Sequence, residues 1–342
     1  MRFRTQRAAD PADGTAAVVA DPPERMRAVV FDAPGGPDVL HEASLEVPSP
    51  VLSEVLVRVV AAGVNPIDAK TRGGSGVFSA LSLPATPGFD FSGVVVRAPY
   101  ETHPFPPGTP VFGMAAFPRT GGTYAEYAVV PSLSLARRPA SLSHVEAAGV
   151  PLAALTAWGL VVETAHAHEG QRMLIHAGAG GVGHFAVQLA AYFGAHVTTT
   201  GSARNAAWLR DLGASVVIDR ESTRFEDVVG EVDVVIDLVG EASDRTGSRS
   251  LSVLRRGGLY VIVPSGSWPG YADAAAAAGL RATHYKVIPD GDALATVARL
   301  LESGSIRVFV DRVFDLADAA AAHAELERGH TRGKLVLRVS DD

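Results

Sequence analysis

A glycine-rich segment carries the clearest chemical signal in the chain. Residues 173–190 read MLIHAGAGGVGHFAVQLA, so a strand-like apolar run precedes the glycines and a helix-like run follows them. In this setting Gly178 would allow a tight turn, Gly180 would let the backbone approach a pyrophosphate, and Gly183 would allow close packing of helix and strand. The helix N-terminus would add amide donors and a favourable dipole. A glycine turn with a purely structural role is the alternative. The candidate dinucleotide contacts in this loop are Gly178, Gly180, Gly181, Val182 and Gly183.

The segment after the next predicted strand bears on which dinucleotide binds. An acidic residue about 20 residues beyond the glycines would accept the ribose hydroxyls of NAD. Residues 198–205 read TTTGSARN instead, and no acid appears before Asp211. Ser202 and Arg204 could hold a 2′-phosphate, with Arg220 as a second charge after the third strand. For Arg204 the alternative is an exposed side chain without a ligand. The sequence therefore predicts NADPH as the cofactor.

The elements around the loop predict two kinds of structure. From residue 170 to about 288, apolar β-branched runs alternate with helical patterns, which predicts a parallel, doubly wound sheet covered on both faces. Before residue 148 the chain holds short β-rich runs between Pro and Gly clusters, which predicts an irregular all-β unit. Between the two, Ser143 and Glu146 have capping-box spacing and predict a helix start. Pro151 is expected to interrupt that helical stretch, and a second helix is expected over residues 156–164. The predicted fold class is α/β with a separate β-rich domain.

Composition excludes several classes of protein. The 342 residues contain no cysteine, which excludes a disulfide framework, a thiolate nucleophile and a thiolate zinc site. The net charge of −7 and the scattered arginines argue against nucleic-acid binding. No apolar run approaches the roughly 18 residues of a membrane-spanning helix, and no apolar region follows the N-terminal arginines as in a secretory signal. We expect a cytoplasmic protein with no nucleic-acid partner and no membrane insertion.

The glycine loop and five further segments resemble the medium-chain dehydrogenase/reductase superfamily, both in their residues and in their order along the chain. Within that superfamily they are most similar to the zinc-free quinone oxidoreductase (zeta-crystallin-like) branch. The resemblance covers the chain from about residue 26 to the C-terminus. The five segments are AGVNPID at 62–68, PGFDFSG at 87–93, GTYAEYA at 122–128, LTAW at 155–158 and GKLVL at 333–337.

The resemblance implies a division of the chain. A GroES-like catalytic domain would comprise residues 26–148 and 289–342, and a Rossmann-type NADPH-binding domain would comprise residues 149–288. The strand predicted near residue 334 would return to the first domain, and the active site would lie between the domains. Relatives in this branch are commonly homodimers, so a homodimer is expected. Residues 1–25 lack sustained periodicity and are expected to be a flexible extension.

The resemblance also bears on metal binding. The zinc alcohol dehydrogenases of the superfamily hold a catalytic metal with Cys, His and Cys. The matching places in this chain are Asn65, Phe89 and approximately Leu152, and this set makes no zinc site. A reaction without zinc fits the reduction of a conjugated system, because hydride then adds to carbon and the carbonyl needs only modest stabilisation.

Single residues take roles from the resemblance. Asn65 matches an asparagine near the nicotinamide, although an asparagine before Pro66 also favours a turn. Lys70 is among the nearest matches to the tyrosines that bacterial quinone oxidoreductases place shortly after this segment. It could donate a proton if burial lowered its pKa. A surface lysine is the alternative. The glycine-rich loop at 73–81 is expected to act as a lid over a hydrophobic substrate. Further cofactor contacts implied by the resemblance are Thr156, Val263, Ser265 and Lys334.

Together these features predict an NADPH-dependent reductase that transfers hydride to a quinone or to an α,β-unsaturated carbonyl compound. An enoyl-thioester or biosynthetic enone reductase is the alternative within enzymes. An NADPH-binding protein without turnover is the alternative from another class.

Overall fold

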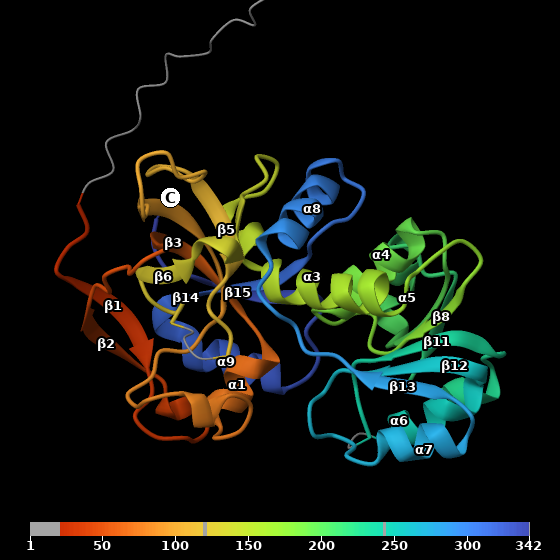
Figure 1. Cartoon of the computed structure of the whole chain (residues 1–342). Helices are drawn as coiled ribbons and strands as arrows, with labels where there is room; N and C mark the ends of the chain where they lie inside the picture. Colours follow the sequence, from red (N-terminus) through yellow and green to blue (C-terminus); the bar gives the residue numbers. More distant parts are fainter. Residues whose placement is uncertain (1–20, 119–121, 242–243, 342) are drawn as a thin grey trace, which may run out of the picture.

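The computed structural model describes residues 21–118, 122–241 and 244–341, which form two lobes side by side (Figure 1). The first lobe is built on a seven-stranded sheet in the order β14-β15-β3-β4-β5-β7, with β6 paired to β3. Neighbouring strands from β3 onwards are antiparallel, as expected for the β-rich domain. The strands are β3 (Glu54–Val64), β4 (Asp90–Arg97), β5 (Pro110–Met114), β6 (Tyr127–Pro131), β7 (Leu135–Arg137), β14 (Val310–Asp315) and β15 (Lys334–Arg338).

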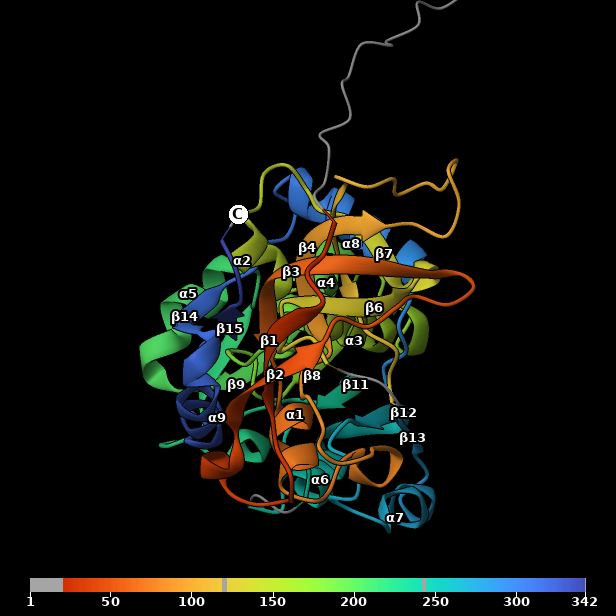
Figure 2. The ribbon, with the colours of Figure 1, turned by 90° about the vertical axis from the view of Figure 1, so that its left-hand side faces the viewer.

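The C-terminal strand returns to this first sheet, as the sequence predicted. β15 pairs antiparallel with β3, so that Leu335 lies opposite Val64 and Arg338 lies opposite Ala61. Residues near 65 and near 334 therefore meet at one end of the sheet, although about 270 residues separate them along the chain. A two-stranded sheet and three helices accompany the first sheet, and Figure 2 shows this side of the molecule. They are β1 (Arg25–Val30), β2 (His41–Glu46), α1 (Pro66–Arg72), α2 (His144–Ala148) and α9 (Ala319–Glu327).

The second lobe contains the predicted parallel sheet. Its six strands run in the order β10-β9-β8-β11-β12-β13, and every neighbouring pair is parallel. This order is that of a doubly wound dinucleotide-binding sheet, in which the direction of winding reverses beside β8. The strands are β8 (Arg172–Ile175), β9 (His196–Gly201), β10 (Val216–Asp219), β11 (Val232–Asp237), β12 (Leu254–Ile262) and β13 (Arg281–His284), and the helices are α4 (Gly183–Tyr192), α5 (Ala206–Asp211), α6 (Thr246–Ser250) and α7 (Tyr271–Ala277).

Helix α3 (Pro151–Trp158) lies where the two lobes meet, and it continues as a π-helical segment over Gly159–Thr164. The predicted interruption before the second helix is confirmed, because α2 ends at Ala148 and α3 is a separate helix. The second helix begins at Pro151 rather than at residue 156, because the first helical turn needs no N–H from proline and its fixed φ suits that position. The predicted capping box is confirmed, since Ser143 Oγ accepts from Glu146 N at 3.2 Å and Glu146 Oε2 accepts from Ser143 N at 2.9 Å. Short 3-10 turns lie at Pro37–Val39, Phe78–Ala80, Ser132–Ser134, Ala203–Asn205, Phe225–Asp227, Leu251–Val253 and Leu316–Asp318.

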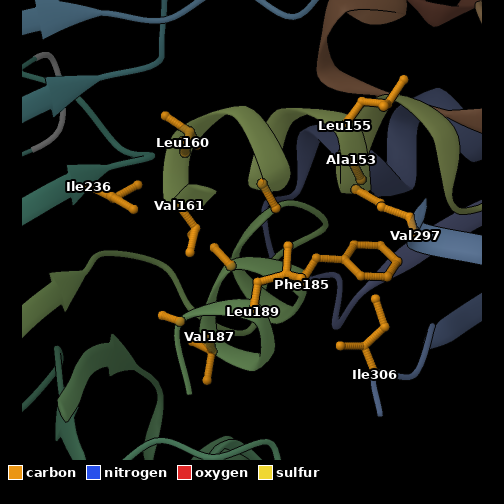
Figure 3. Packing of buried hydrophobic residues seen from close by; sticks show 14 of the residues in the cluster. Ala153, Leu155, Leu160, Val161, Phe185, Val187, Leu189, Ile236, Val297 and Ile306 are labelled. Carbon is orange, nitrogen blue, oxygen red and sulfur yellow. The ribbon is translucent and has the colours of Figure 1, made fainter. Parts of the chain in front are cut away.

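One apolar core runs through both lobes. Phe185 of α4 is fully buried and points toward Val297 and Ile306 (Figure 3), in a cluster that also includes Leu155 of α3. Val297 belongs to α8 (Gly291–Glu302), which packs against both α3 and β7. Phe89 and residues of β5 extend the same core into the first lobe. This shared core sets how the lobes lie against each other, so it also sets the geometry between them. Over the described ranges, no helix combines the length and apolar character required to cross a membrane.

Replacing Phe185 with alanine tests this core. We expect Phe185→Ala to lower the free energy of unfolding by about 3–5 kcal/mol, because it leaves a cavity where three helices meet. Tyr192→Ala, on the same helix but with the tyrosine 52% exposed, should cost far less. Urea titrations of both variants measure the difference. Equal losses would show that Phe185 does not anchor the shared core.

Candidate cofactor and active site

The glycine turn connects β8 to α4, and its glycines are required for different reasons. A Cβ on Gly178 would lie 2.0 Å from Thr199 Oγ1, and one on Gly183 would lie 2.2 Å from the Ala177 carbonyl oxygen. Gly183 thus allows the close helix–strand approach predicted for it. The role of Gly178 differs from the predicted one of allowing the tight turn. The left-handed φ of the turn (53°) lies at Ala177, and Gly178 is needed because β9 approaches it closely. Gly180, Gly181 and Val182 complete the turn before α4.

The first lobe contacts this turn directly. Gly333 N donates to the Ala179 carbonyl oxygen at 2.9 Å. Next in the chain, the side chain of Lys334 passes Gly181 so closely that a Cβ there would lie 3.2 Å from Lys334 Cδ. Lys334 is only 3% exposed. The turn that fits a pyrophosphate and the buried lysine of the other lobe therefore share one site.

Asn65 is the N-cap of α1 and is buried at the end of this lysine. Its Oδ1 accepts a hydrogen bond from Lys334 Nζ, and its Nδ2 donates to Asp90 Oδ2 at 2.9 Å. A flipped amide would place its NH₂ against the ammonium and its oxygen against the carboxylate, so the orientation of Asn65 is determined. An amide nitrogen carries two hydrogens, and only one is used by Asp90. The second can hold a carbonyl oxygen.

Asp90 ties this group to the second lobe. Its Oδ1 accepts from Leu152 N, in the first turn of α3, at 2.7 Å. Its Oδ2 lies 3.5 Å from Lys334 Nζ, and that ammonium also donates to the Val64 carbonyl oxygen at 3.3 Å. Burial raises the pKa of Asp90 and lowers the pKa of Lys334, and their mutual attraction opposes both shifts. Asp90 therefore orients Asn65.

Sequence reasoning missed a second buried carboxylate, three residues after Asn65. Asp68 Oδ2 accepts from Asn65 N at 2.8 Å and from Tyr124 Oη at 3.4 Å, and Tyr124 Oη also lies 3.1 Å from His323 Nε2. Among the described residues, Asp68 Oδ1 has no hydrogen-bond partner. Burial, followed by the charge of Asp90, raises the pKa of Asp68 to about 7, against the hydrogen bond from Asn65. The capping-box spacing of Asn65 and Asp68 was the signal that could have revealed this contact.

The residues predicted to read a 2′-phosphate lie together at the ends of β9 and β10. Arg220 N donates to the Gly201 carbonyl oxygen at 2.9 Å, which brings the two strand ends together. Ser202 Oγ accepts from Asn205 Nδ2 at 3.2 Å. The exposed Arg204 donates from Nη2 to the His330 carbonyl oxygen at 3.1 Å, in the loop before β15. Ligands of doubly wound sheets bind at this carboxyl edge.

Among the other predicted site residues, some are buried and others are exposed to water. Thr156 is buried in α3 and its Oγ1 donates to the Leu152 carbonyl oxygen at 2.6 Å. Val263 follows β12 and donates from its N to the Asp237 carbonyl oxygen at 3.0 Å, and Ser265 is exposed beyond it. Lys70 is exposed in the last turn of α1. The desolvation on which its proton-donor role depended is absent, because water reaches this side chain.

The side chains at the matched metal positions do not fit zinc. Phe89 is buried and packs edge-to-face on Phe117 with ring centroids 5.1 Å apart. Leu152 has no donor atom in its side chain, its backbone N–H and carbonyl oxygen bond to Asp90 and Thr156, and Asn65 is held by Lys334 and Asp90. In the part of the chain that the structure describes, no group of three or more His, Cys, Asp or Glu side chains could hold a metal ion. The set lacks the nitrogen, sulfur and carboxylate donors that zinc takes.

Asp68 provides a test of the buried polar group through pH. Its folded pKa of about 7 exceeds its ordinary 3.8, so the folded state holds the proton more tightly. This contribution to stability is complete below pH 3.8 and is lost as the pH rises through about 7. We therefore expect the stability of the wild type minus that of Asp68→Asn to fall between pH 4 and pH 8, measured by urea unfolding. Glu101→Gln, at an exposed position, should show no such trend, and a flat difference for Asp68→Asn would contradict the assignment.

Comparison with known proteins agrees with this geometry. Residues 52–140 match the alcohol dehydrogenase GroES-like domain family, and residues 212–337 match the zinc-binding dehydrogenase family. The chloroplastic NADPH-dependent alkenal/one oxidoreductase of Arabidopsis thaliana is 33% identical over 92% of this chain and 80% of its own length. The quinone oxidoreductase structure from Coxiella burnetii has a TM-score of 0.88 at 38% identity, covering 92% of this chain and all of that one. The NADPH complex of Escherichia coli quinone oxidoreductase has a TM-score of 0.82 at 29% identity, with the same coverage of both chains. The chain belongs to the medium-chain dehydrogenase/reductase superfamily, with quinone oxidoreductases among its relatives.

Proposed function

We propose that this protein is an NADPH-dependent reductase that transfers hydride, without zinc, to a quinone or to the β-carbon of an α,β-unsaturated carbonyl compound. The observation that carries the proposal is the meeting of the glycine turn with the buried Lys334, Asn65 and Asp90. A dinucleotide turn and an oriented amide donor then lie within one site, and the matched metal positions offer no zinc ligands. The alkenal/one and quinone acceptors named for the relatives support the substrate class.

The residues of this chain bind and orient the reactants. The backbone amides of the glycine turn and the N-terminus of α4, a ten-residue helix, suit the pyrophosphate. NADPH, when bound, would supply the hydride. The second Nδ2–H of Asn65 would hold an oxygen of the nicotinamide amide or of the acceptor, and Lys334 with Asp90 keeps that donor in place.

Apolar side chains from four segments favour a hydrophobic acceptor. Phe89 belongs to the shared core, and Ile67, Val77 and Phe117 are partly buried against the same core. Val77 belongs to the loop at 73–81, which was predicted to be a lid. An apolar surrounding excludes water and strengthens each hydrogen bond to a substrate oxygen. Water would supply the proton that completes the reduction.

We also propose that two copies pair as a homodimer. Strand β13 lies at the end of the six-stranded sheet, and among the described residues it pairs with β12 alone. Its other side offers unpaired backbone groups that a second copy could bind.

An acceptor screen tests the proposed activity. NADPH oxidation should depend on 1,4-benzoquinone or a simple enone and should persist after dialysis against EDTA. We expect Asn65→Ala to lower kcat about a hundredfold, because it removes a preorganised donor, with a small change in the Kd for NADPH. Lys70→Ala is the comparison for the other predicted catalytic residue, and its exposure predicts a much smaller loss.

Other outcomes of this screen separate the alternatives. Turnover with crotonyl-CoA alone would favour an enoyl-thioester reductase. Tight NADPH binding without turnover of any acceptor would reject the reductase and favour a binding protein.

Arg204→Ala tests the choice of cofactor. Arg204 lies in the turn that follows β9, so the loss of its guanidinium should raise the Kd for NADPH about tenfold and change the Kd for NADH little. Fluorescence titration with each dinucleotide measures both constants. Equal effects on the two would show that Arg204 does not contact the 2′-phosphate.

A further inference from the structure

Asp219 ends β10 beside the predicted 2′-phosphate site. In the parallel pairing of β9 and β10, Asp219 lies opposite Gly201, the residue before Ser202. The next residue, Arg220, donates its N–H to the Gly201 carbonyl oxygen at 2.9 Å. After the second strand, where an acid would mark an NAD site, the sequence has no acid before Asp211. The structure brings one to the same edge from the third strand.

The carboxylate of Asp219 is held in place and charged. Its Oδ2 accepts from Ser222 Oγ at 2.7 Å, and its Oδ1 accepts from Glu221 N at 3.3 Å. These hydrogen bonds lower the pKa of Asp219, and the backbone N–H of Ala203 and the charge of Arg220 act in the same direction. Ala203 lies between Ser202 and Arg204 in the chain. The carboxylate therefore lies close to the turn that would contact the adenosine ribose.

We propose that Asp219 is a specificity-determining residue that limits the preference of this protein for NADPH over NADH. The inference rests on the dinucleotide site of the proposed function. A 2′-phosphate at the end of β9 would be attracted by Arg204 and Arg220 and repelled by Asp219. The 2′-hydroxyl of NADH carries no charge and can donate a hydrogen bond to a carboxylate. The site therefore accepts both dinucleotides with a modest preference.

A purely structural role for Asp219 makes a different prediction. If the carboxylate only closes the turn through Ser222 and Glu221, its replacement should change the binding of both dinucleotides by the same factor. Electrostatic discrimination instead changes the ratio of the two dissociation constants, and that change should shrink at high salt.

The test compares Asp219→Asn with the wild type and with Glu221→Gln. The control removes a negative charge two residues away, from an exposed side chain. Kd values for NADPH and NADH are measured by fluorescence titration at low salt and at about 1 M salt, where the Debye length is about 3 Å. We expect Asp219→Asn to bind NADPH about tenfold more tightly at low salt and to bind NADH equally or more weakly. Glu221→Gln should change the ratio less than about twofold.

Three outcomes would overturn the inference. The first is an unchanged ratio of the dissociation constants for NADH and NADPH in Asp219→Asn. The second is a change of that ratio in favour of NADH, and the third is an equal change of the ratio in Glu221→Gln. Circular dichroism verifies that each variant folds, and Asp219→Ser replaces Asp219→Asn if that variant does not. Failure of the wild type to bind either dinucleotide would reject the proposed function and this inference together. Binding of both with an unaffected ratio would reject the role of Asp219 alone.

Discussion

The rest of the site depends on a buried ammonium. Lys334 Nζ lies among Asn65 Oδ1, the Val64 carbonyl oxygen and Asp90 Oδ2, with its aliphatic chain along Gly181. A charge in such a place is tolerated only if it is paired and hydrogen-bonded, and losing one partner of a buried pair costs about 3–5 kcal/mol. The lysine can be there only because β15 pairs with β3 and places residues 334 and 65 at the same end of one sheet.

The same group links three parts of the molecule. Asp90 begins β4 and accepts from the first turn of α3, while Lys334 touches the glycine turn of the second lobe. The apolar core through Phe185 holds the lobes in the arrangement that allows both contacts. Stability and chemistry are therefore coupled, since the residues that would orient a substrate oxygen also satisfy one another's buried charges.

The two predicted sheet types and the glycine turn could be foreseen because they depend on local patterns. Alternation of β-branched strands with helices specifies a parallel sheet, and the glycines follow one of those strands directly. Short strands such as β7 and β13 were missed, since three or four residues carry too little periodicity and form only by pairing with neighbours. The second of the two predicted helices begins at Pro151, earlier than expected, because proline is favoured in the first turn of a helix.

The candidate site shows where local information ends. The sequence by itself determined the dinucleotide turn, the absence of cysteine and the amide at position 65, because each is a matter of residue type and spacing. Only the tertiary structure decided that Asp90 and Lys334 orient that amide, that Asp68 is buried beside it and that Lys70 is exposed. It also decided that Asp219 from the third strand lies beside the end of the second. The physical reason is that pairing between strands distant in sequence determines which charges share a site. Burial then determines how strongly those charges interact and how far their pKa values shift.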